Sequence, residues 1–158
     1  MIRLEIDIEP TLTALQAMLE RLRDLRPAWR SVLAYLRRAM IGTFATQGQR
    51  IGQPWRPLSA TYAKYKAVKF PGQPILRASD RMFGSLVGSN NEAVEDVERQ
   101  SLTYGTRTPY AKYHQRGTPR MAKRRFLTVT ETDRREIQAA VKAHLRHQGA
   151  ISGFGGLR

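Results

Sequence analysis

Residues 27–45 read PAWRSVLAYLRRAMIGTFA. Within this stretch apolar residues recur every three or four positions, as they do along one face of a helix, and arginines fall on the other faces. A proline suits the first turn of a helix, because the N–H that it lacks would have no partner there. The pattern therefore predicts a helix that begins at Pro27 and carries an apolar stripe. The stripe consists of Trp29, Leu33, Leu36, Met40 and Phe44.

The residues before this helix predict a strand and another helix. Apolar and charged residues alternate over residues 2–8, which is the pattern of a strand with one buried face. Pro10 ends that strand and opens a helix with leucines at helical spacing. In both helices the stripe favours core packing, and a binding groove is the other interpretation. The leucines are Leu12, Leu15, Leu19 and Leu22.

The middle of the chain is irregular. Glycines and prolines punctuate residues 48–74, and they leave room only for a short helix after Ser59. A loop this long in a compact domain is usually functional or ordered by a neighbour. Ser79 is placed to cap another short helix. Residues 93–99 and 101–105 are predicted to be two strands, close enough to pair as a hairpin.

A last helix is predicted near the C-terminus. Asp133, followed three residues later by Glu136, resembles a capping box. Residues 149–158 contain four glycines and little that could pack, so we expect a flexible tail after a single domain over residues 1–148. The fold class is α+β: two N-terminal helices and a C-terminal helix on a small, mostly antiparallel sheet, with long irregular loops. The last helix presents one apolar face, formed by Ile137, Ala140, Val141 and Leu145.

Charge is the feature of the composition that bears most on function. Lys and Arg number 27 against 13 Asp and Glu, which gives a formal net charge of +14. Such a charge attracts nucleic acid, acidic protein surfaces or anionic lipid. The beginning of the chain does not fit a secretory signal peptide, and no apolar stretch approaches the roughly 20 residues of a membrane span. We therefore expect no membrane partner, and a protein that stays in a cytosol or leaves it inside a particle released by lysis.

No pattern in the sequence indicates catalysis. The chain has no cysteine, which excludes disulfides, thiolate metal sites and cysteine nucleophiles. Neither a Gly-x-Ser-x-Gly elbow, a Ser-x-x-Lys motif nor a P-loop is present. His144 and His147 could share a helix face, but a third metal ligand is not in sight. We expect no cofactor, no metal and no active site.

Two segments are candidates for binding. Trp55 lies between two prolines, where it could anchor the core or plug into a partner. The other segment places five cations within ten residues, beside Tyr110, Tyr113 and Phe126. Basic groups among aromatic ones can bind a nucleic-acid backbone and stack on bases, and a basic loop can equally meet an acidic protein. The five cations are Arg116, Arg120, Lys123, Arg124 and Arg125.

Five segments occur in a characteristic order: GQPWRPLS at 52–59, ILRAS at 75–79, YGT at 104–106, YAKYHQRG at 110–117 and RRFL at 124–127. In this order they resemble the virion morphogenesis, or tail completion, family of tailed bacteriophages, over roughly residues 30–147. Two positions depart from the family pattern. Arg116 stands where an apolar or aromatic residue is more usual, and Arg125 stands where proline is common.

The resemblance implies a structural virion protein at the head–tail junction, which completes or terminates the tail or forms part of the neck. Related proteins form rings, typically hexameric, around the DNA channel. It also implies assembly in the host cytoplasm, other neck and tail proteins as partners, and contact with DNA in the channel. The alternative is a basic DNA-binding protein that uses residues 116–125. Our candidates for subunit or partner contacts are Trp55, Tyr110, Tyr113, His114, Gln115 and Arg116.

Overall fold

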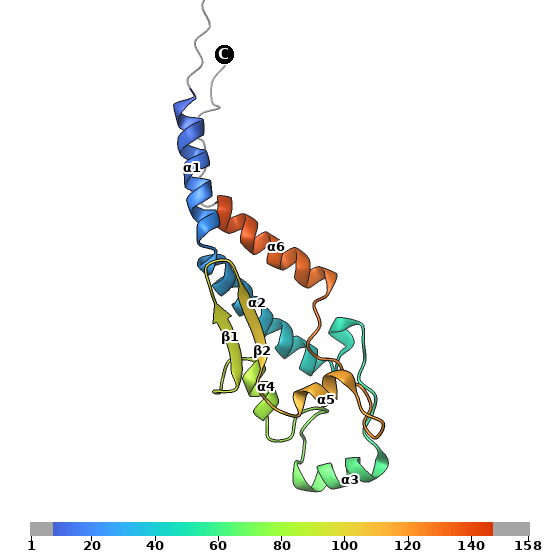
Figure 1. Ribbon diagram of the computed structural model, residues 1–158. Helices are drawn as coiled ribbons and strands as arrows, with labels where there is room; N and C mark the ends of the chain where they lie inside the picture. The colour runs from blue at the N-terminus through green and yellow to red at the C-terminus, as the bar shows by residue number, and fades with distance from the viewer. Residues whose placement is uncertain (1–7, 147–158) are drawn as a thin grey trace, which may run out of the picture.

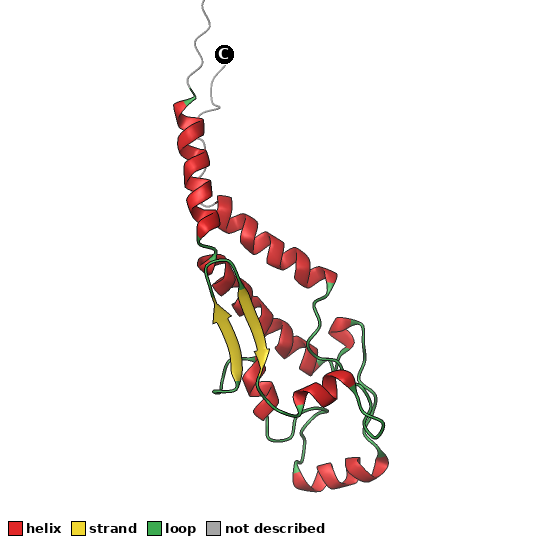
Figure 2. Cartoon of the chain, in the orientation of Figure 1, coloured by secondary structure: helices red, strands yellow, loops and turns green. Residues whose placement is uncertain are grey.

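The computed structural model describes residues 8–146. Within that range the chain forms helices and one antiparallel hairpin, so the predicted α+β class is confirmed (Figure 2). The strand predicted over residues 2–8 and the predicted tail lie outside the described residues, apart from Ile8. The elements are α1 (Glu9–Arg23), α2 (Arg26–Ala45), η1 (Gln49–Ile51), α3 (Ala60–Lys69), α4 (Arg81–Leu86), β1 (Ala93–Val97), β2 (Leu102–Thr106), α5 (Ala111–Arg116) and α6 (Glu131–Arg146).

Helix α2 is the element around which the others are arranged. The hairpin and α4 pack on α2, and α6 runs along it (Figure 1). Strands β1 and β2 pair antiparallel in a register that places Ala93 opposite Thr106 and Val97 opposite Leu102, which confirms the predicted hairpin. Helix α3 lies at the far end of the molecule from α1, joined to the body by long loops (Figures 1 and 2). Among the described helices, none is long and apolar enough to cross a membrane.

The hydrophobic core centres on Phe44, near the end of α2. Its ring lies 5.2 Å from the ring of Trp55, 5.2 Å from that of Phe83 and 6.1 Å from that of Phe126. Of the predicted stripe, Met40 and Phe44 are fully buried. Trp29, Leu33 and Leu36 are half-buried. The buried residues of the core cluster are Met40, Phe44, Trp55, Met82, Leu86, Ala111 and Phe126.

Helix α1 differs from the prediction that both N-terminal helices pack on the sheet. Asp24 is extended and ends α1, and α1 then projects beyond the body of the molecule (Figure 1). Its base is fixed to α6, because Arg21 donates to the carbonyl of Leu145 (2.9 Å) and His144 Nε2 lies 3.0 Å from the carbonyl of Asp24. No residue of α1 is buried. Core packing within one chain therefore does not explain its leucine stripe.

Two helix starts also differ from the sequence prediction. Helix α4 begins after Asp80 rather than at a Ser79 cap, and Asp80 adopts a left-handed backbone (φ 55°). The capping box of α6 lies three residues earlier than predicted. Thr130 Oγ1 accepts from the N–H of Asp133 (3.1 Å), and Asp133 Oδ2 accepts from the N–H of Thr130 (2.8 Å). Asp133 is therefore the last residue of the box, at position N3 of the helix, rather than its first.

Asp133 also ties α6 to the rest of the fold. Its side chain is 2% exposed, and it accepts hydrogen bonds from Tyr35 Oη (2.7 Å), from Arg50 and from Thr130. Burial raises the pKa of this carboxyl, but the hydrogen bonds from Arg50, Thr130 and Tyr35 outweigh burial and hold the pKa at about 2. A buried carboxylate with this many donors stays ionised in the folded chain.

We predict that Asp133→Asn lowers the free energy of unfolding at pH 7 by roughly 2 kcal/mol, because a carboxyl with a depressed pKa stabilises the fold when ionised. This stabilisation is complete above the unfolded pKa near 4, and it is lost as the pH falls through the folded pKa of about 2. Urea unfolding at several pH values measures it. A difference between wild type and variant that does not shrink below pH 4 contradicts the prediction, and the exposed Glu131→Gln is the control.

Candidate functional site

A pocket of about 980 Å³ opens between α3, α5 and the loop that leads into α4. This volume is at the upper end of the range for ligand sites, so the pocket can accept several side chains of a partner. Three of its aromatic residues come from α3 and from the residue that follows it. The apolar and aromatic lining consists of Leu58, Tyr62, Tyr65, Phe70, Leu76, Met82, Tyr110 and Met121.

The charged lining of the pocket is almost entirely positive. Asp80 is its one carboxylate, and it is paired with Arg77 through two hydrogen bonds of 2.7 Å. Arg56 and Arg120, in contrast, have no side-chain partner among residues 8–146. The pocket therefore presents an unbalanced positive charge beside apolar surface, which suits a partner that is both acidic and apolar. The cations in the lining are Arg56, Lys66, Arg77, Arg81, Arg120 and Arg124.

Two of these cations are buried and hold the pocket together. Lys66, 5% exposed, donates to the carbonyl of Pro74, and burial lowers the pKa of its amine. Arg124, 7% exposed, donates to the carbonyls of Arg56 (2.8 Å) and Pro57 (2.9 Å). These bonds join the loop before α3, the loop after it and the segment before α6. Arg124 and Lys66 therefore mainly hold these three segments together.

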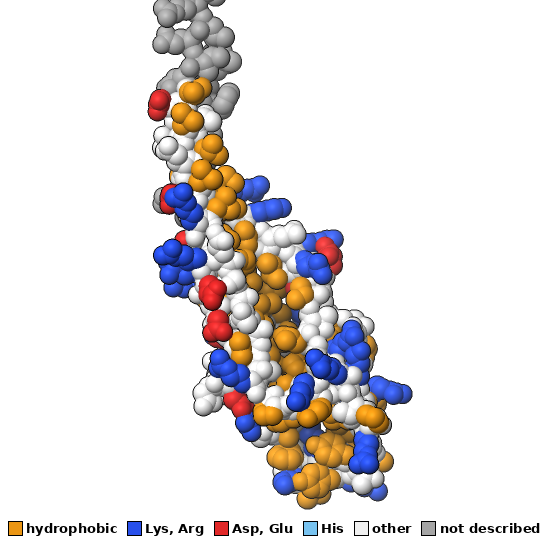
Figure 3. Space-filling model, viewed as in Figure 1, with side chains coloured by type: hydrophobic (Ala, Val, Ile, Leu, Met, Phe, Trp, Pro, Cys, Tyr) orange, Lys and Arg blue, Asp and Glu red, His pale blue; other side chains and the backbone are white. Residues whose placement is uncertain are grey.

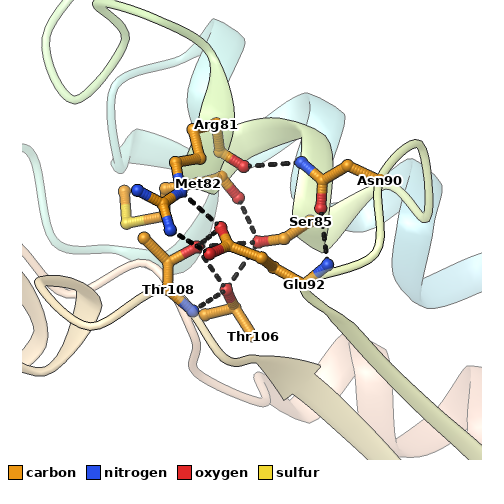
Figure 4. A network of polar contacts seen from close by, with 7 residues as sticks. All are labelled: Arg81, Met82, Ser85, Asn90, Glu92, Thr106 and Thr108. Carbon is orange, nitrogen blue, oxygen red and sulfur yellow. Dashed lines mark hydrogen bonds and ion pairs between the residues drawn. The ribbon is translucent and has the colours of Figure 1, made fainter.

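A polar network under the pocket fixes Arg81 at its edge (Figure 4). Glu92 accepts from Arg81 and from Thr108 Oγ1 (2.9 Å), so the guanidinium is held by a carboxylate that the hairpin positions. The hydroxyl of Ser85 lies 2.5 Å from that of Thr106, deep in the same network. The hydrogen bonds drawn in Figure 4 link α4 to the hairpin and to the residues that flank it. The network therefore has a structural role.

His114 lies in the pocket wall with its ring edge-on to Tyr110, at 6.0 Å between ring centroids. Burial lowers the pKa of its imidazole, and the nearby guanidinium of Arg124 lowers it further. Its Nδ1 is buried and finds no hydrogen-bond partner within the described part of the chain. His114 is thus a neutral polar group in the wall of an otherwise cationic pocket.

Gln115 holds the segment before α6 against α5. Its Oε1 accepts from the N–H groups of Phe126 (3.0 Å) and Leu127 (3.2 Å), and its Nε2 donates to the carbonyl of Leu127 (2.7 Å). Gly117 ends α5 with φ 79°, and a Cβ there would stand about 3.0 Å from Lys123. Gln115 therefore acts on the chain's own backbone rather than on a partner.

Trp55 lies in the core, which is the first of the two alternatives for this residue. It is 6% exposed, and its indole N–H donates to the carbonyl of Arg125 (2.6 Å). Gly48 makes room for the ring: it has φ 87°, and a Cβ there would stand 2.7 Å from the indole. The buried indole therefore offers little aromatic surface to a partner, and its contact in an interface stays a prediction.

The predicted basic cluster divides into two groups. Arg120 and Arg124 line the pocket, whereas Arg116, Lys123 and Arg125 are exposed outside its lining. The remaining predicted contact residues divide in the same way. Tyr110 and His114 line the pocket, and Tyr113 is 47% exposed, with the amine of Lys112 5.1 Å from its ring.

The sequence prediction missed the pocket residues of α3 and of the loop that follows it. Tyr62, Tyr65 and Lys66 place two aromatic residues and a basic one within about one and a half turns, and this signal could have placed α3 beside the basic cluster. Nothing in the sequence around Arg77 and Arg81 indicates a pocket. In the structure each of them is paired with a carboxylate. The described residues contain no group of three or more His, Asp or Glu side chains that could hold a metal ion.

The fold and the site together define a small α+β protein with a basic, aromatic binding pocket. A model of the phage virion morphogenesis family matches residues 6–146, nearly the whole chain, and the chain belongs to that family. The expected family resemblance is thereby confirmed, and with it a role in building bacteriophage particles. Comparison with curated proteins and with solved structures found no match.

We predict that Trp55→Ala lowers the free energy of unfolding by about 3–5 kcal/mol, because it leaves a cavity beside Phe44 and an unpaired carbonyl at Arg125. Chemical denaturation measures the loss. Trp55→Phe should cost less, since it keeps most of the volume, and the exposed Tyr113→Ala should cost under about 0.5 kcal/mol. Equal stability of Trp55→Ala and wild type contradicts the core role.

Proposed function

We propose that this chain is a structural virion protein at the head–tail junction, as a tail completion, tail terminator or neck component, and that it acts through protein–protein contacts without catalysing a reaction. The observation that carries the proposal is the family match over residues 6–146. In this proposal the protein is assembled in the host cytoplasm and ends in the virion. The five ordered motifs of the sequence favour this place within the family's general role.

The pocket is our candidate for the contact with a neighbouring protein. Tyr62 and Tyr65 are each about half exposed at its mouth, at 45% and 50%. Aromatic and arginine side chains are the residues that dominate binding energy at protein interfaces. Arg56 and Arg120 supply charge that the described chain does not neutralise. The partner segment that fits is acidic and carries at least one large apolar side chain.

A ring of identical subunits, most simply a hexamer, is the assembly that we propose for this contact. In a closed ring each interface joins two different patches of the subunit, so one end of the molecule meets the other end or side of its neighbour. Helix α3, which lines the pocket, and helix α1 lie at opposite ends of the molecule (Figure 1), and this separation is compatible with such a ring. DNA in the channel of such a ring would then meet exposed cations.

We predict that Tyr62→Ala and Arg120→Glu each leave the chain folded but weaken the partner contact. Loss of an aromatic anchor costs about 2 kcal/mol, which is roughly a thirtyfold loss of affinity. In a complementation test of the phage that encodes this chain, the expected result is unjoined heads and tails, counted by electron microscopy.

Arg134→Glu is the matched control, since it reverses an exposed charge on α6, away from the pocket. It should complement like the wild type. Normal virions from both pocket variants, with thermal melting that shows them folded, would remove the pocket from the proposed contact. A failure of the control variant as well would assign the effect of Arg120→Glu to net charge, and the uncharged change Tyr62→Ala would then be the test of the pocket.

The second candidate function is DNA binding, favoured by the exposed side chains of Arg116, Lys123 and Arg125. Each cation that neutralises a phosphate adds about 0.9 to the slope of log affinity against log salt. If these three contact the duplex, reversing all of them to Glu should reduce that slope by roughly 3, whereas Arg56→Glu in the pocket should not. Fluorescence anisotropy with a short duplex measures this. Absence of binding by the wild type at low salt removes DNA as the main partner.

A further inference from the structure

The apolar face of α1 is the largest unpartnered feature of the described chain. Hydrophobic side chains follow the helix along its projecting length (Figure 3). Leu15 is 53% exposed and Leu19 49%. Without packing, a helix of 15 residues is only marginally stable in water. Most helices of this length depend on packing of their apolar face. The exposed stripe consists of Ile8, Leu12, Leu15, Met18, Leu19 and Leu22.

The stripe has the spacing of a coiled-coil seam. From Ile8 the steps to Leu12, Leu15, Leu19 and Leu22 are four, three, four and three residues. This is a mean repeat of 3.5, which keeps a seam facing one partner helix, and Met18 widens the stripe on one side of that seam. With Leu12 and Leu19 at the a positions, Ile8, Leu15 and Leu22 occupy the d positions. The natural occupant of such a seam is a second helix with the same spacing.

The stripe does not face the chain's own body. The less exposed side of α1 carries Ala14, Ala17 and Arg21, and Arg21 is the residue that bonds to α6. At about 100° per residue the middle of this group lies roughly 150° around the helix from the middle of the leucine stripe. Attachment to α6 therefore fixes the direction of α1 and leaves its seam open.

We propose that α1 pairs with α1 of a second copy of this chain as a short antiparallel coiled coil. The charges at the flanks of the seam favour this occupant and this direction. Glu9 and Arg23 both occupy e positions, and in an antiparallel pair e meets e of the partner helix. A register that packs Leu12 against Leu22 of the other copy places Glu9 beside the second copy's Arg23, at both ends of the pair. Arg23 also bonds to Glu20 of its own helix (2.5 Å), so Glu9 would add a second carboxylate to that guanidinium. A parallel pair offers no such match.

The geometry of the free helix permits this pairing. An α1 of 15 residues is about 22 Å long and projects from the body, so the two bodies would lie at opposite ends of the pair (Figure 1). Leu15 meets Leu19 of the other copy on each side of the twofold axis, and Gln16 meets its own copy at the axis. The contact is isologous and uses no pocket residue. It is distinct from the proposed ring contact and does not rest on the proposed function.

Cysteine cross-linking of the purified full chain tests the pairing, since the natural chain has no cysteine. With a short bis-maleimide, Gln16→Cys should cross-link to itself, and Leu12→Cys should cross-link to Leu22→Cys when the two variants are mixed. Self-cross-linking of Leu12→Cys without these products would mean a parallel pair and overturn the proposal. Absence of any cross-link between copies would overturn it as well, because the stripe would then be covered by something else.

The mass in solution supplies a second readout. The double variant Leu15→Glu/Leu19→Glu should lower the mass measured by sedimentation equilibrium, to one half where the α1 pair is the only contact between copies. Thr13→Glu, on the opposite side of α1, is the matched control and should keep the mass of the wild type. An unchanged mass in the double variant overturns the proposal, and so does an equal fall in both variants.

Discussion

The end of the molecule that contains the pocket depends on side chains that satisfy backbone groups. The segment of residues 124–127 has no strand beside it, yet its polar groups are bonded: Gln115 takes both N–H groups of Phe126 and Leu127, and Trp55 donates to the carbonyl of Arg125. Arg124 in turn donates to two carbonyls before α3. Because a buried backbone group without a partner is costly, these bonds decide where three irregular segments can lie. The pocket is the space that they enclose.

The charge of +14 therefore has two roles in the molecule. Some arginines serve the fold, as Arg50 does beside Asp133 and Arg37 beside Glu95. Others, such as Arg120, face solvent at the pocket. Net charge alone overstates the surface available to an anionic partner, because a guanidinium that is bonded to a carboxylate contributes little field at a distance. The pocket matters because its cations outnumber its single acid within a confined, partly apolar space.

Local patterns in the sequence predicted the elements better than their arrangement. The helix over α2, the short helix after Ser59 and the hairpin all follow from spacing and turn residues, and each is present. The position of the capping box was predicted wrongly because an aspartate such as Asp133 can be either the first or the last residue of the motif. The projection of α1 was missed for a different reason: a leucine stripe shows that a face will be covered, but not whether the same chain covers it. The pocket is formed by segments that lie about 50 residues apart in the sequence, and a local sequence pattern does not show that such segments meet.

The family motifs are explained by this architecture more than by chemistry at a surface. In the motif at 52–59 Trp55 fills the core and Ser59 caps α3, and in the motif at 110–117 Ala111 is buried and Gly117 ends α5 with a positive φ. A sequence that keeps these residues keeps the enclosed segments, and so it keeps the pocket whatever binds there. The two departures from the pattern, Arg116 and Arg125, are both exposed and both add positive charge. The residues of these motifs that hold the fold are thus different from the two that add exposed charge, and it is the exposed charge that distinguishes this chain from the family pattern.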